Sequence, residues 1–157
     1  MNRAFCLRAA TTEDREFIFA SYKTTLRQYV QWAWGWDEEF QLSGFWKHHP
    51  LEEFQVVVVG STRAGAMHVQ EQESLNFIRM IFLLPEFQGS GIGSQLLCGE
   101  VARAQELAKQ LHLKVIKINP AKRLYDRLGF SIIEEDSVSY HMRAAQQVAP
   151  ADGYAAP

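Results

Sequence analysis

The segment that most constrains the fold of this chain is PEFQGSGIGSQLL, residues 85–97. Three glycines, Gly89, Gly91 and Gly93, stand at every second position between an apolar run that ends at Leu84 and a run with helical spacing. Glycine loses more conformational freedom on folding than any other residue, and a single turn does not need three of them. A strand that leads through such a loop into a helix presents successive backbone N–H groups to an anion. The segment therefore predicts a strand–loop–helix unit with a ligand against its backbone.

Three kinds of ligand-binding loop are rich in glycine. A Walker phosphate loop has a lysine after its last glycine, whereas Gly93 is followed by Ser94 and Gln95. The dinucleotide fingerprint GxGxxG, counted from Gly89, requires a third glycine where Ser94 stands. The segment from Gln88 to Gly93 does fit Q/R-x-x-G-x-G/A, in which N–H groups at a helix N-terminus bind a pyrophosphate. A glycine-rich turn that binds nothing is the alternative for the loop alone.

Hydrophobic periodicity predicts an α/β domain around this unit. Alternating or continuous apolar runs mark strands at about 4–9, 54–60, 64–70, 75–84, 113–118, 130–136 and 138–143. Helical spacing marks helices at about 12–32, 37–46, 93–111 and 120–129. We expect a mixed central sheet of about seven strands flanked by four helices, in one domain over residues 1–143. The Ala/Pro/Gly-rich segment 144–157 is expected to be a disordered tail.

Composition restricts the class of protein. The chain has 157 residues, enough for one domain with a proper core. Its net charge of −2 and pI near 6.2 argue against a nucleic-acid partner. No apolar stretch would serve as a signal peptide or membrane span, so we expect a cytoplasmic protein without a membrane partner. Cys6 and Cys98 lack metal-binding spacing, so we expect no metal and two buried thiols in a reducing compartment.

Two separated motifs, LLPEFQGSGIG and INPAKRLYDRLGF, and the order of elements between them resemble the GNAT superfamily of acyl-CoA N-acyltransferases over residues 5–143. The resemblance implies the GNAT fold and acetyl-CoA as co-substrate. It implies that the glycine loop cradles the CoA pyrophosphate, that the strand end around Phe82 and Leu84 pairs with the pantetheine arm, and that Asn119 contacts the cofactor. Lys122, in the next helical turn, either meets a CoA phosphate or faces water. The residues expected to bind the cofactor are Phe82, Leu83, Leu84, Gln88, Gly89, Ser90, Gly91, Ile92, Gly93, Ser94, Asn119 and Lys122.

Amide formation from a thioester requires a neutral amine, a polarised carbonyl and a proton for the leaving sulfur. A strand N–H near Leu83 or Leu84 can polarise the carbonyl. The resemblance implies that Tyr125 protonates the departing thiolate, and a phenol with a pKa of roughly 10 suits that role. From its helical spacing alone, Tyr125 would be a core tyrosine beside Ala121 and Leu128.

The sequence does not identify a general base. Many members of the family carry a glutamate seven residues before the proline that corresponds to Pro85, and here that position is Ile78. The nearby titratable residues are Glu71, Glu73, His68 and His141. A lone histidine on a strand is more often structural, and a water or an amine that arrives neutral would also suffice. We assign no base.

The segment WAWGWDEEF, residues 32–40, is the candidate acceptor wall. Acidic residues beside aromatic rings suit a cationic amine, so we expect Trp34, Asp37 and Glu38 to contact the acceptor. The alternative is that Asp37 only caps the following helix, with Glu38 and Glu39 in its first turn. The pair of histidines before Pro50 is expected to be a loop rather than a metal pair.

These features predict an N-acetyltransferase that moves an acetyl group directly from acetyl-CoA to a primary amine of a small molecule or peptide. Direct transfer is expected because no cysteine occupies a motif position. One alternative is a non-catalytic domain that binds acyl-CoA as a sensor or partner module. Another is an enzyme that transfers a longer acyl chain, or that modifies protein N-termini or lysines. A homodimer is left open.

Overall fold

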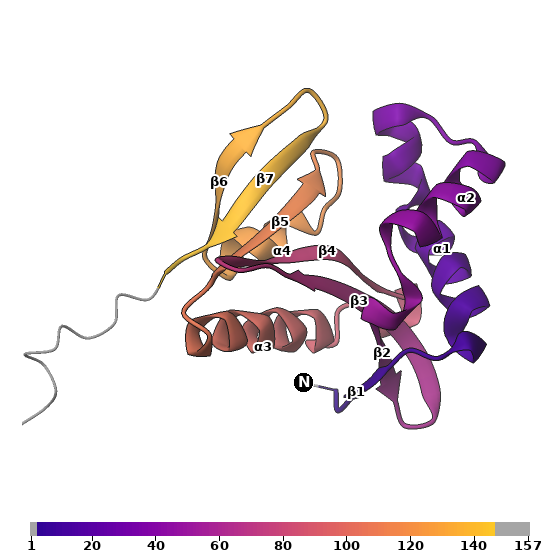
Figure 1. Cartoon of the computed structure of the whole chain (residues 1–157), viewed down its shortest axis with the longest axis horizontal. Coiled ribbons are helices and arrows are strands. Elements are labelled where there is room, and N and C mark those ends of the chain that lie inside the picture. Colours follow the sequence, from indigo (N-terminus) through magenta and orange to yellow (C-terminus); the bar gives the residue numbers. More distant parts are fainter. Residues whose placement is uncertain (1–2, 147–157) are drawn as a thin grey trace, which may run out of the picture.

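The computed structural model describes residues 3–146, which form an α/β domain with a single sheet (Figure 1). The strands are β1 (Cys6–Ala9), β2 (Phe54–Val59), β3 (Thr62–Glu71), β4 (Leu75–Leu83), β5 (Gln110–Ile116), β6 (Phe130–Glu135) and β7 (Ser139–Ala144). The helices are α1 (Arg15–Trp34), α2 (Glu38–His48), α3 (Ile92–Glu106) and α4 (Lys122–Arg127), with 3-10 turns η1 (Thr12–Asp14), η2 (Leu51–Glu53) and η3 (Pro85–Phe87). The predicted mixed sheet of seven strands with four helices is confirmed. The predicted tail lies, from residue 147 on, outside the described residues, and the domain boundary stays a prediction.

The sheet is split along its middle. Its strand order is β1-β2-β3-β4-β5-β7-β6, and only β4 and β5 are parallel. These two strands pair only between Leu75–Ile78 and Gln110–Leu113. Beyond Ile78, β4 stays paired with β3, while β5 stays paired with β7, so the two strands diverge (Figure 1). A register shift opposite His68 and Val69 leaves Arg79 as an extra residue on β4 at the point of divergence. The carboxyl-terminal half of β4 therefore has an unpaired side that faces the opening.

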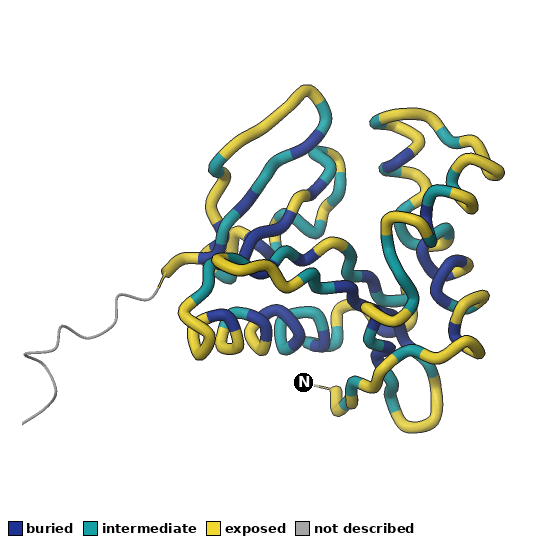
Figure 2. The backbone as a smooth tube through the Cα atoms, viewed as in Figure 1, coloured by how far each residue is buried: buried dark blue, intermediate teal, exposed yellow. Residues whose placement is uncertain are grey.

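Helices cover both faces of the sheet. Side chains of α1 and α2 pack with β2, β3 and β4 in one cluster, which includes Ile18, Phe19, Phe45, Phe54, Val56, Ala66 and Phe82. Side chains of α3 and α4 pack on the other face, in clusters that include Ile92, Leu96, Leu97, Ala104, Leu111, Leu113, Tyr125 and Met142. Five consecutive residues of β3, Ala64–His68, are buried, as expected for a strand with helices on both faces of its sheet (Figure 2). The end of β4 is thus held between two packed layers.

The start of α1 is fixed by buried charge. Thr11 and Asp14 form a capping box. The buried Asp14 carboxylate also accepts two hydrogen bonds from the Arg8 guanidinium, at 2.7 and 2.9 Å, and one from Arg63 at 3.2 Å. These contacts tie η1 to β1 and β3, because each arginine comes from one of those strands.

The structure contradicts the predicted end of the third helix and the predicted burial of the two cysteines. The third helix was expected to reach residue 111, but α3 ends at Glu106 and Leu111 is buried in β5. The reason is that Leu107 and Leu111 repeat the helical spacing across a turn in which Ala108 has a φ of 54°. Both cysteines were expected to be buried, yet Cys6 and Cys98 are exposed. Cys6 lies on the edge strand β1, and Cys98 lies on the solvent side of α3.

None of the helices within residues 3–146 is long and apolar enough to cross a membrane.

Candidate functional site

The glycine segment needs its glycines for two different reasons. Gly89 and Gly91 have φ angles of 72° and 83°, in the left-handed region that other residues avoid. Gly93 lies in the first turn of α3, where an added Cβ would meet a Leu124 methyl group at 3.4 Å. The first two glycines turn the chain so that α3 begins directly after Gly91, and the third lets α3 lie close to α4.

The N-terminus of α3 carries free backbone donors. Its N-cap, Gly91, has no side chain with which to cap the helix, and Gln95 donates to the Gly91 carbonyl at 3.1 Å. The N–H groups of Ile92, Gly93 and Ser94 therefore have no acceptor within the helix. These groups and the helix dipole favour an anion at this position.

A groove of about 520 Å³ runs from this N-terminus along the end of β4 to α4, and we call it the glycine groove. Its lining includes Phe82, Leu83, Gln88, Gly89, Gly91, Gly93, Ser94, Asn119 and Tyr125, all of which the sequence predicted as site residues. The structure therefore brings together the loop, the strand end and the short helix that the two motifs contain.

Three predicted cofactor residues of the loop and of α4 do not line the glycine groove. Ile92 is fully buried in the core. The Ser90 hydroxyl donates to the Phe87 carbonyl at 2.8 Å. The Lys122 ammonium group pairs with Asp126 at 2.8 Å, one turn further along α4. The contributions of Ile92 and Ser90 to the groove are therefore limited to their backbone.

The end of β4 turns alternate backbone groups toward the glycine groove. Leu84, the fourth predicted residue outside the groove lining, donates its N–H to the Ala64 carbonyl of β3 at 2.8 Å. Successive residues of a strand point these groups to opposite sides, so those of Leu83 and Ile81 face away from β3. Accordingly, the Gln88 side-chain amide donates to the Leu83 carbonyl at 2.8 Å. Of the two predicted backbone donors, Leu83 and Leu84, only the N–H of Leu83 faces the groove. The strand residues whose backbone groups are free to pair with a ligand are Ile81 and Leu83, each one residue before the predicted Phe82 and Leu84.

Tyr125 is both a core residue and part of the groove wall. Its ring is buried and lies 5.8 Å from that of Phe130, centroid to centroid. Burial raises the pKa of its phenol to about 12. The hydroxyl therefore keeps its proton throughout the neutral pH range and can act as a hydrogen-bond donor.

A second cavity, of about 790 Å³, lies on the α1 side of the sheet, and we call it the histidine cavity. It shares the wall residues Leu26, Ile81, Asn119 and Tyr125 with the glycine groove, so the two spaces adjoin. Its titratable wall residues are Tyr22, His49, Arg79, His112, Lys114, Tyr125, Glu134 and His141. Tyr125 thus lies at the junction of the glycine groove and a cavity with polar walls.

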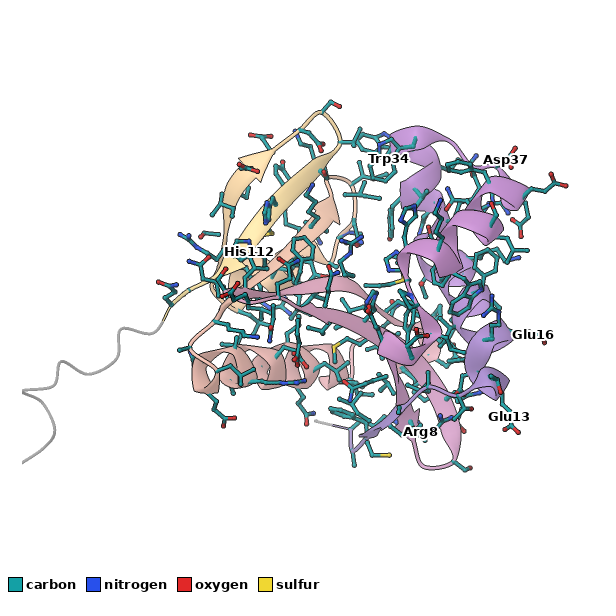
Figure 3. The ribbon with its side chains drawn as sticks, viewed as in Figure 1. Arg8, Glu13, Glu16, Trp34, Asp37 and His112 are labelled. Atoms are coloured by element: carbon teal, nitrogen blue, oxygen red, sulfur yellow. The ribbon has the colours of Figure 1, made fainter. Side chains whose placement is uncertain are left out.

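Of the three predicted acceptor residues, only Trp34 lines the histidine cavity. Figure 3 shows its side chain on the side of α1 that faces the strands, whereas Asp37 points outward. Asp37 caps α2, accepting a backbone hydrogen bond at 2.8 Å. Glu38 accepts from the Lys23 ammonium at 2.7 Å and from the Trp36 indole at 2.8 Å. The alternative interpretation, a helix cap, therefore describes Asp37 in the structure.

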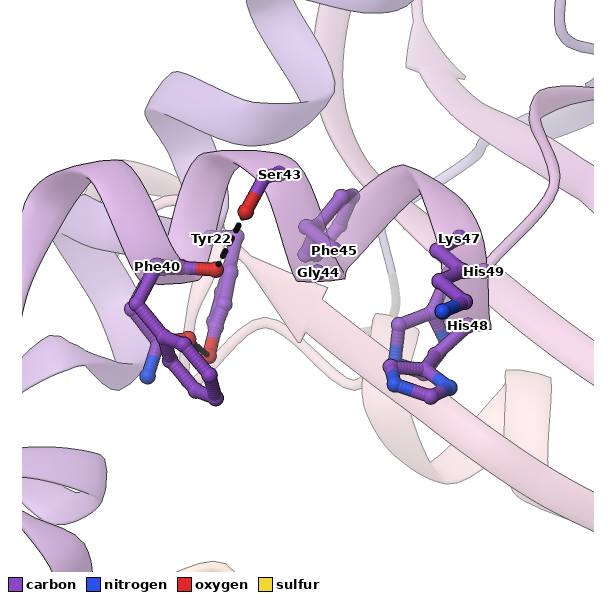
Figure 4. A pocket seen from close by; sticks show the side chains of 9 residues that line it. Tyr22, Phe40, Ser43, Gly44, Phe45, Lys47, His48 and His49 are labelled. Atoms are coloured by element: carbon purple, nitrogen blue, oxygen red, sulfur yellow. Dashed lines mark hydrogen bonds between the residues drawn. The ribbon is translucent and has the colours of Figure 1, made fainter.

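A third cavity, of about 470 Å³, lies against α2 (Figure 4). Tyr22 and His49 line both this cavity and the histidine cavity. The histidines before Pro50 were expected in a loop, but His48 is the last residue of α2 and His49 is its C-cap. Among residues 3–146, no three His, Cys, Asp or Glu side chains gather closely enough to hold a metal ion.

The family profile described as "Acetyltransferase (GNAT) domain" matches residues 50–132, more than half of the chain. The chain belongs to the GNAT acetyltransferase family. No curated protein matches the chain in sequence.

Solved structures share the fold of this GNAT domain at low sequence identity. The PaiA N-acetyltransferase of Thermoplasma acidophilum, in complex with coenzyme A, is 18% identical with a TM-score of 0.71, covering 91% of this chain and 99% of that one. PH1933 from Pyrococcus horikoshii is 18% identical with a TM-score of 0.72, covering 92% and 100%. Naa50 from Arabidopsis thaliana, in complex with the bisubstrate analogue CoA-Ac-MVNAL, is 15% identical with a TM-score of 0.64, covering 91% and 99%. These similarities establish the GNAT fold.

The sequence did not indicate that α1 lines both spaces of this GNAT domain. Thr25, Leu26 and Tyr29 face the glycine groove, and Val30 faces the histidine cavity. Their helical spacing marks a single face, but only the packing of α1 across the divergent strands shows what that face borders. His49 was also missed as a wall residue, because nothing in its local sequence connects it to the cavity.

Proposed function

We propose that this GNAT protein transfers an acetyl group from acetyl-CoA directly to a primary amine of a small molecule or peptide. The observation that carries the proposal is the position of Tyr125, which lines both the glycine groove and the histidine cavity. A donor at that junction lies where a cofactor in the groove would meet an acceptor in the cavity.

Acetyl-CoA fits the chemistry of the glycine groove. The free N–H groups of Ile92, Gly93 and Ser94 suit a pyrophosphate, and the open backbone of Ile81 and Leu83 suits the amides of a pantetheine arm. The PaiA protein of the same fold was crystallised with coenzyme A, which agrees with this assignment. The Leu83 carbonyl already accepts one hydrogen bond from the Gln88 amide, so a pantetheine amide would either share this carbonyl or displace Gln88.

The transfer then needs three groups at the junction: the Leu83 N–H, the amine of the acceptor and the Tyr125 hydroxyl. The Leu83 N–H is positioned to polarise the thioester carbonyl. The amine attacks the carbonyl carbon, and the C–S bond breaks as the sulfur receives a proton. Tyr125 supplies that proton. Its pKa of about 12 makes complete transfer to a thiolate in water unfavourable, but the burial that raises this pKa also destabilises the thiolate.

The acceptor lies, in this proposal, in the histidine cavity rather than beside Asp37 and Glu38. A structurally similar protein, Naa50, was crystallised with a bisubstrate analogue that contains a peptide, which agrees with an amine acceptor. Protein N-termini and lysines therefore remain acceptors to test alongside small amines.

The proposal is tested with a panel of small amines, amino acids and peptides, with acetyl-CoA as donor and the released CoA thiol detected. Turnover that depends on one amine supports the transferase, and an acylated amine found by mass spectrometry identifies the product. Acetyl-CoA binding without thiol release on any acceptor would instead favour the non-catalytic sensor. Longer acyl-CoA donors in the same assay decide the acyl length.

A further inference from the structure

Three side chains, Glu53, His68 and His49, form a hydrogen-bonded chain from the protein surface to the histidine cavity, and we call this chain the relay. The Glu53 carboxylate, at the end of η2, lies 2.5 Å from His68 Nε2 on β3. His68 Nδ1 lies 2.9 Å from His49 Nδ1, at the C-cap of α2. His68 is fully buried, with 1% of its side chain exposed, whereas Glu53 is half-exposed. His49, the third member, lines the histidine cavity.

This arrangement determines which ring nitrogens carry protons. His68 Nε2 faces a carboxylate and therefore carries a hydrogen. In neutral His68, Nδ1 is then an acceptor, so His49 Nδ1 must be the donor across the 2.9 Å contact. His49 Nε2 is left with a free lone pair. The relay thus presents one unprotonated nitrogen at its cavity end.

The relay lies beside the point where β4 leaves β5. His68 pairs with Met80, the residue before Ile81, whose backbone faces the glycine groove. His49 and Tyr125 line the same cavity. Ile78, on the neighbouring part of β4, is buried in the core and supplies no base.

Two other titratable wall residues, His112 and Tyr22, are less suited to accept a proton. His112 uses both ring nitrogens, toward His141 at 2.9 Å and Gln110 at 2.8 Å. His112 also pairs with Phe77, where β4 and β5 are still joined. Burial raises the pKa of Tyr22 to about 12, so it stays protonated.

A metal site does not explain the relay. A metal ion needs the lone pairs of its ligands to converge on one point. Here the imidazoles of His49 and His68 are directed at each other, 2.9 Å apart. Their contact is that of a proton donor and a proton acceptor.

We propose that His49 is the general base of the acetyl transfer, with His68 and Glu53 as positioning residues that stabilise the proton it accepts. This inference rests on the proposed function. As the amine nitrogen bonds to the thioester carbon, its proton passes to His49 Nε2, and the Nδ1 proton of His49 moves to His68 Nδ1. The positive charge then sits on His68 beside the Glu53 carboxylate. The C–S bond breaks, the sulfur takes the Tyr125 proton, and the relay returns one proton to Tyr125 through water.

The charges around His49 agree with this role. Burial lowers the pKa of His49 to about 4, and His68 on β3, Arg79 on β4 and neighbouring His48 act in the same direction. His49 is therefore neutral at pH 7 and free to accept a proton. An isolated imidazole with so low a pKa would be a weak base. Burial also lowers the pKa of His68, but the hydrogen bond and negative charge of Glu53 oppose that shift and stabilise the charge that the relay transfers to His68.

The kinetic test compares His49→Gln with His48→Gln, the same substitution one residue earlier on an exposed position. His49→Gln should lower kcat by roughly 10²- to 10⁴-fold, the usual range for a general base, and leave the KM for acetyl-CoA unchanged. His48→Gln should retain parental kcat. Glu53→Gln keeps the hydrogen bond to His68 but removes the charge, so it should lower kcat less than His49→Gln does. Parental kcat in folded His49→Gln would overturn the proposal.

A spectroscopic test does not depend on turnover. Nitrogen-15 NMR of the full-length protein at pH 7 should show His49 protonated at Nδ1 and unprotonated at Nε2. In Glu53→Gln, the first protonation of the His49–His68 pair should move to lower pH, because the nearby negative charge is gone. A His49 protonated at Nε2 would overturn the relay. A parent protein that acetylates no amine would overturn the proposed function instead, so the two failures are distinguishable.

Discussion

The glycine groove and the histidine cavity meet at Tyr125, but their polar surfaces differ in kind. The groove offers backbone: the N–H groups at the start of α3 and the open side of β4. The cavity offers side chains, with three histidines, Arg79, Lys114 and Glu134 on its walls. Backbone donors bind a ligand wherever the fold keeps the same backbone conformation. Side chains, in contrast, can be substituted without a change in that backbone conformation. We infer that the groove carries the chemistry shared by the family and the cavity carries the choice of acceptor.

The largest expected effect is at the junction of the two spaces. Tyr125→Phe keeps the ring and its packing, so the fold should survive while kcat falls by roughly 10²- to 10⁴-fold, about 3–5 kcal/mol of barrier. The KM for acetyl-CoA should barely move, because a thioester sulfur is a poor hydrogen-bond acceptor. Steady-state kinetics with a varied donor measures both.

The signature of this role is an equal loss in kcat and kcat/KM, which marks a contact made only in the transition state. Unchanged kcat in the folded variant, with chemistry shown to limit turnover, would leave Tyr125 as a core residue only. The proton would then come from water or from another group at the junction.

The second prediction tests whether the backbone of the glycine loop binds acetyl-CoA. Gly91→Val should abolish the stabilisation by acetyl-CoA, since a β-branched residue resists the φ of 83° and would obstruct the approach to the N–H groups. In the parent, ligand at 100 times its Kd should add about 2.7 kcal/mol to the free energy of unfolding. Thermal melting with and without acetyl-CoA measures the difference.

Gly99→Val is the matched control for that experiment. Gly99 lies exposed in α3, and an added Cβ would meet nothing within 4 Å. This variant should keep the full shift in Tm. If Gly91→Val keeps it as well, the glycine loop is not the pyrophosphate site.

The same contrast explains what the sequence could predict. Gly89, Gly91 and the apolar run before them encode a local path. The strand, the loop, the helix and the groove residues from Phe82 to Ser94 therefore followed from a short segment. The contact between His49 and His68 joins residues 19 positions apart, and it exists only because α2 ends against β3. The sequence contained both residues but not the packing that makes them neighbours.

Asp37 is the opposite case, in which local sequence left two interpretations open. Its acidic character beside tryptophans suggested a ligand, but a carboxylate at an N-cap satisfies the helix it precedes. Short-range hydrogen bonding in the structure accounts for Asp37, and Lys23 and Trp36 account for Glu38. The residue types near Asp37 did not show whether its carboxylate caps α2 or contacts the acceptor.

The third prediction concerns Asp37 and Glu38, which line neither the glycine groove nor the histidine cavity. Asp37→Ala should lower the free energy of unfolding by about 0.5–2 kcal/mol through loss of the cap. Combined with Glu38→Gln, it should leave the KM values of both acetyl-CoA and the acceptor unchanged, because neither side chain lines the histidine cavity. Chemical denaturation and kinetics on the same double variant separate the two effects. A raised acceptor KM at constant kcat would restore the acidic residues to the acceptor site.

The smallest expected effect is a difference in how the stability of the protein depends on pH, which should involve the histidine cavity and not the glycine groove. His49 has a pKa of about 4 in the folded protein, below the 6.5 of a free histidine, so the unfolded chain binds more protons between these values. Stability should therefore fall as pH drops from 6.5 to 4. His49→Gln should show a shallower loss of Tm across that window than the parent, and His48→Gln should follow the parent. No histidine is among the described residues that line the glycine groove, so at each pH the Tm shift from saturating acetyl-CoA should be nearly the same in His49→Gln as in the parent. Parallel Tm curves for His49→Gln and the parent would mean that His49 is not held neutral by its surroundings, and the contrast between a backbone groove and a titratable cavity would lose its main support.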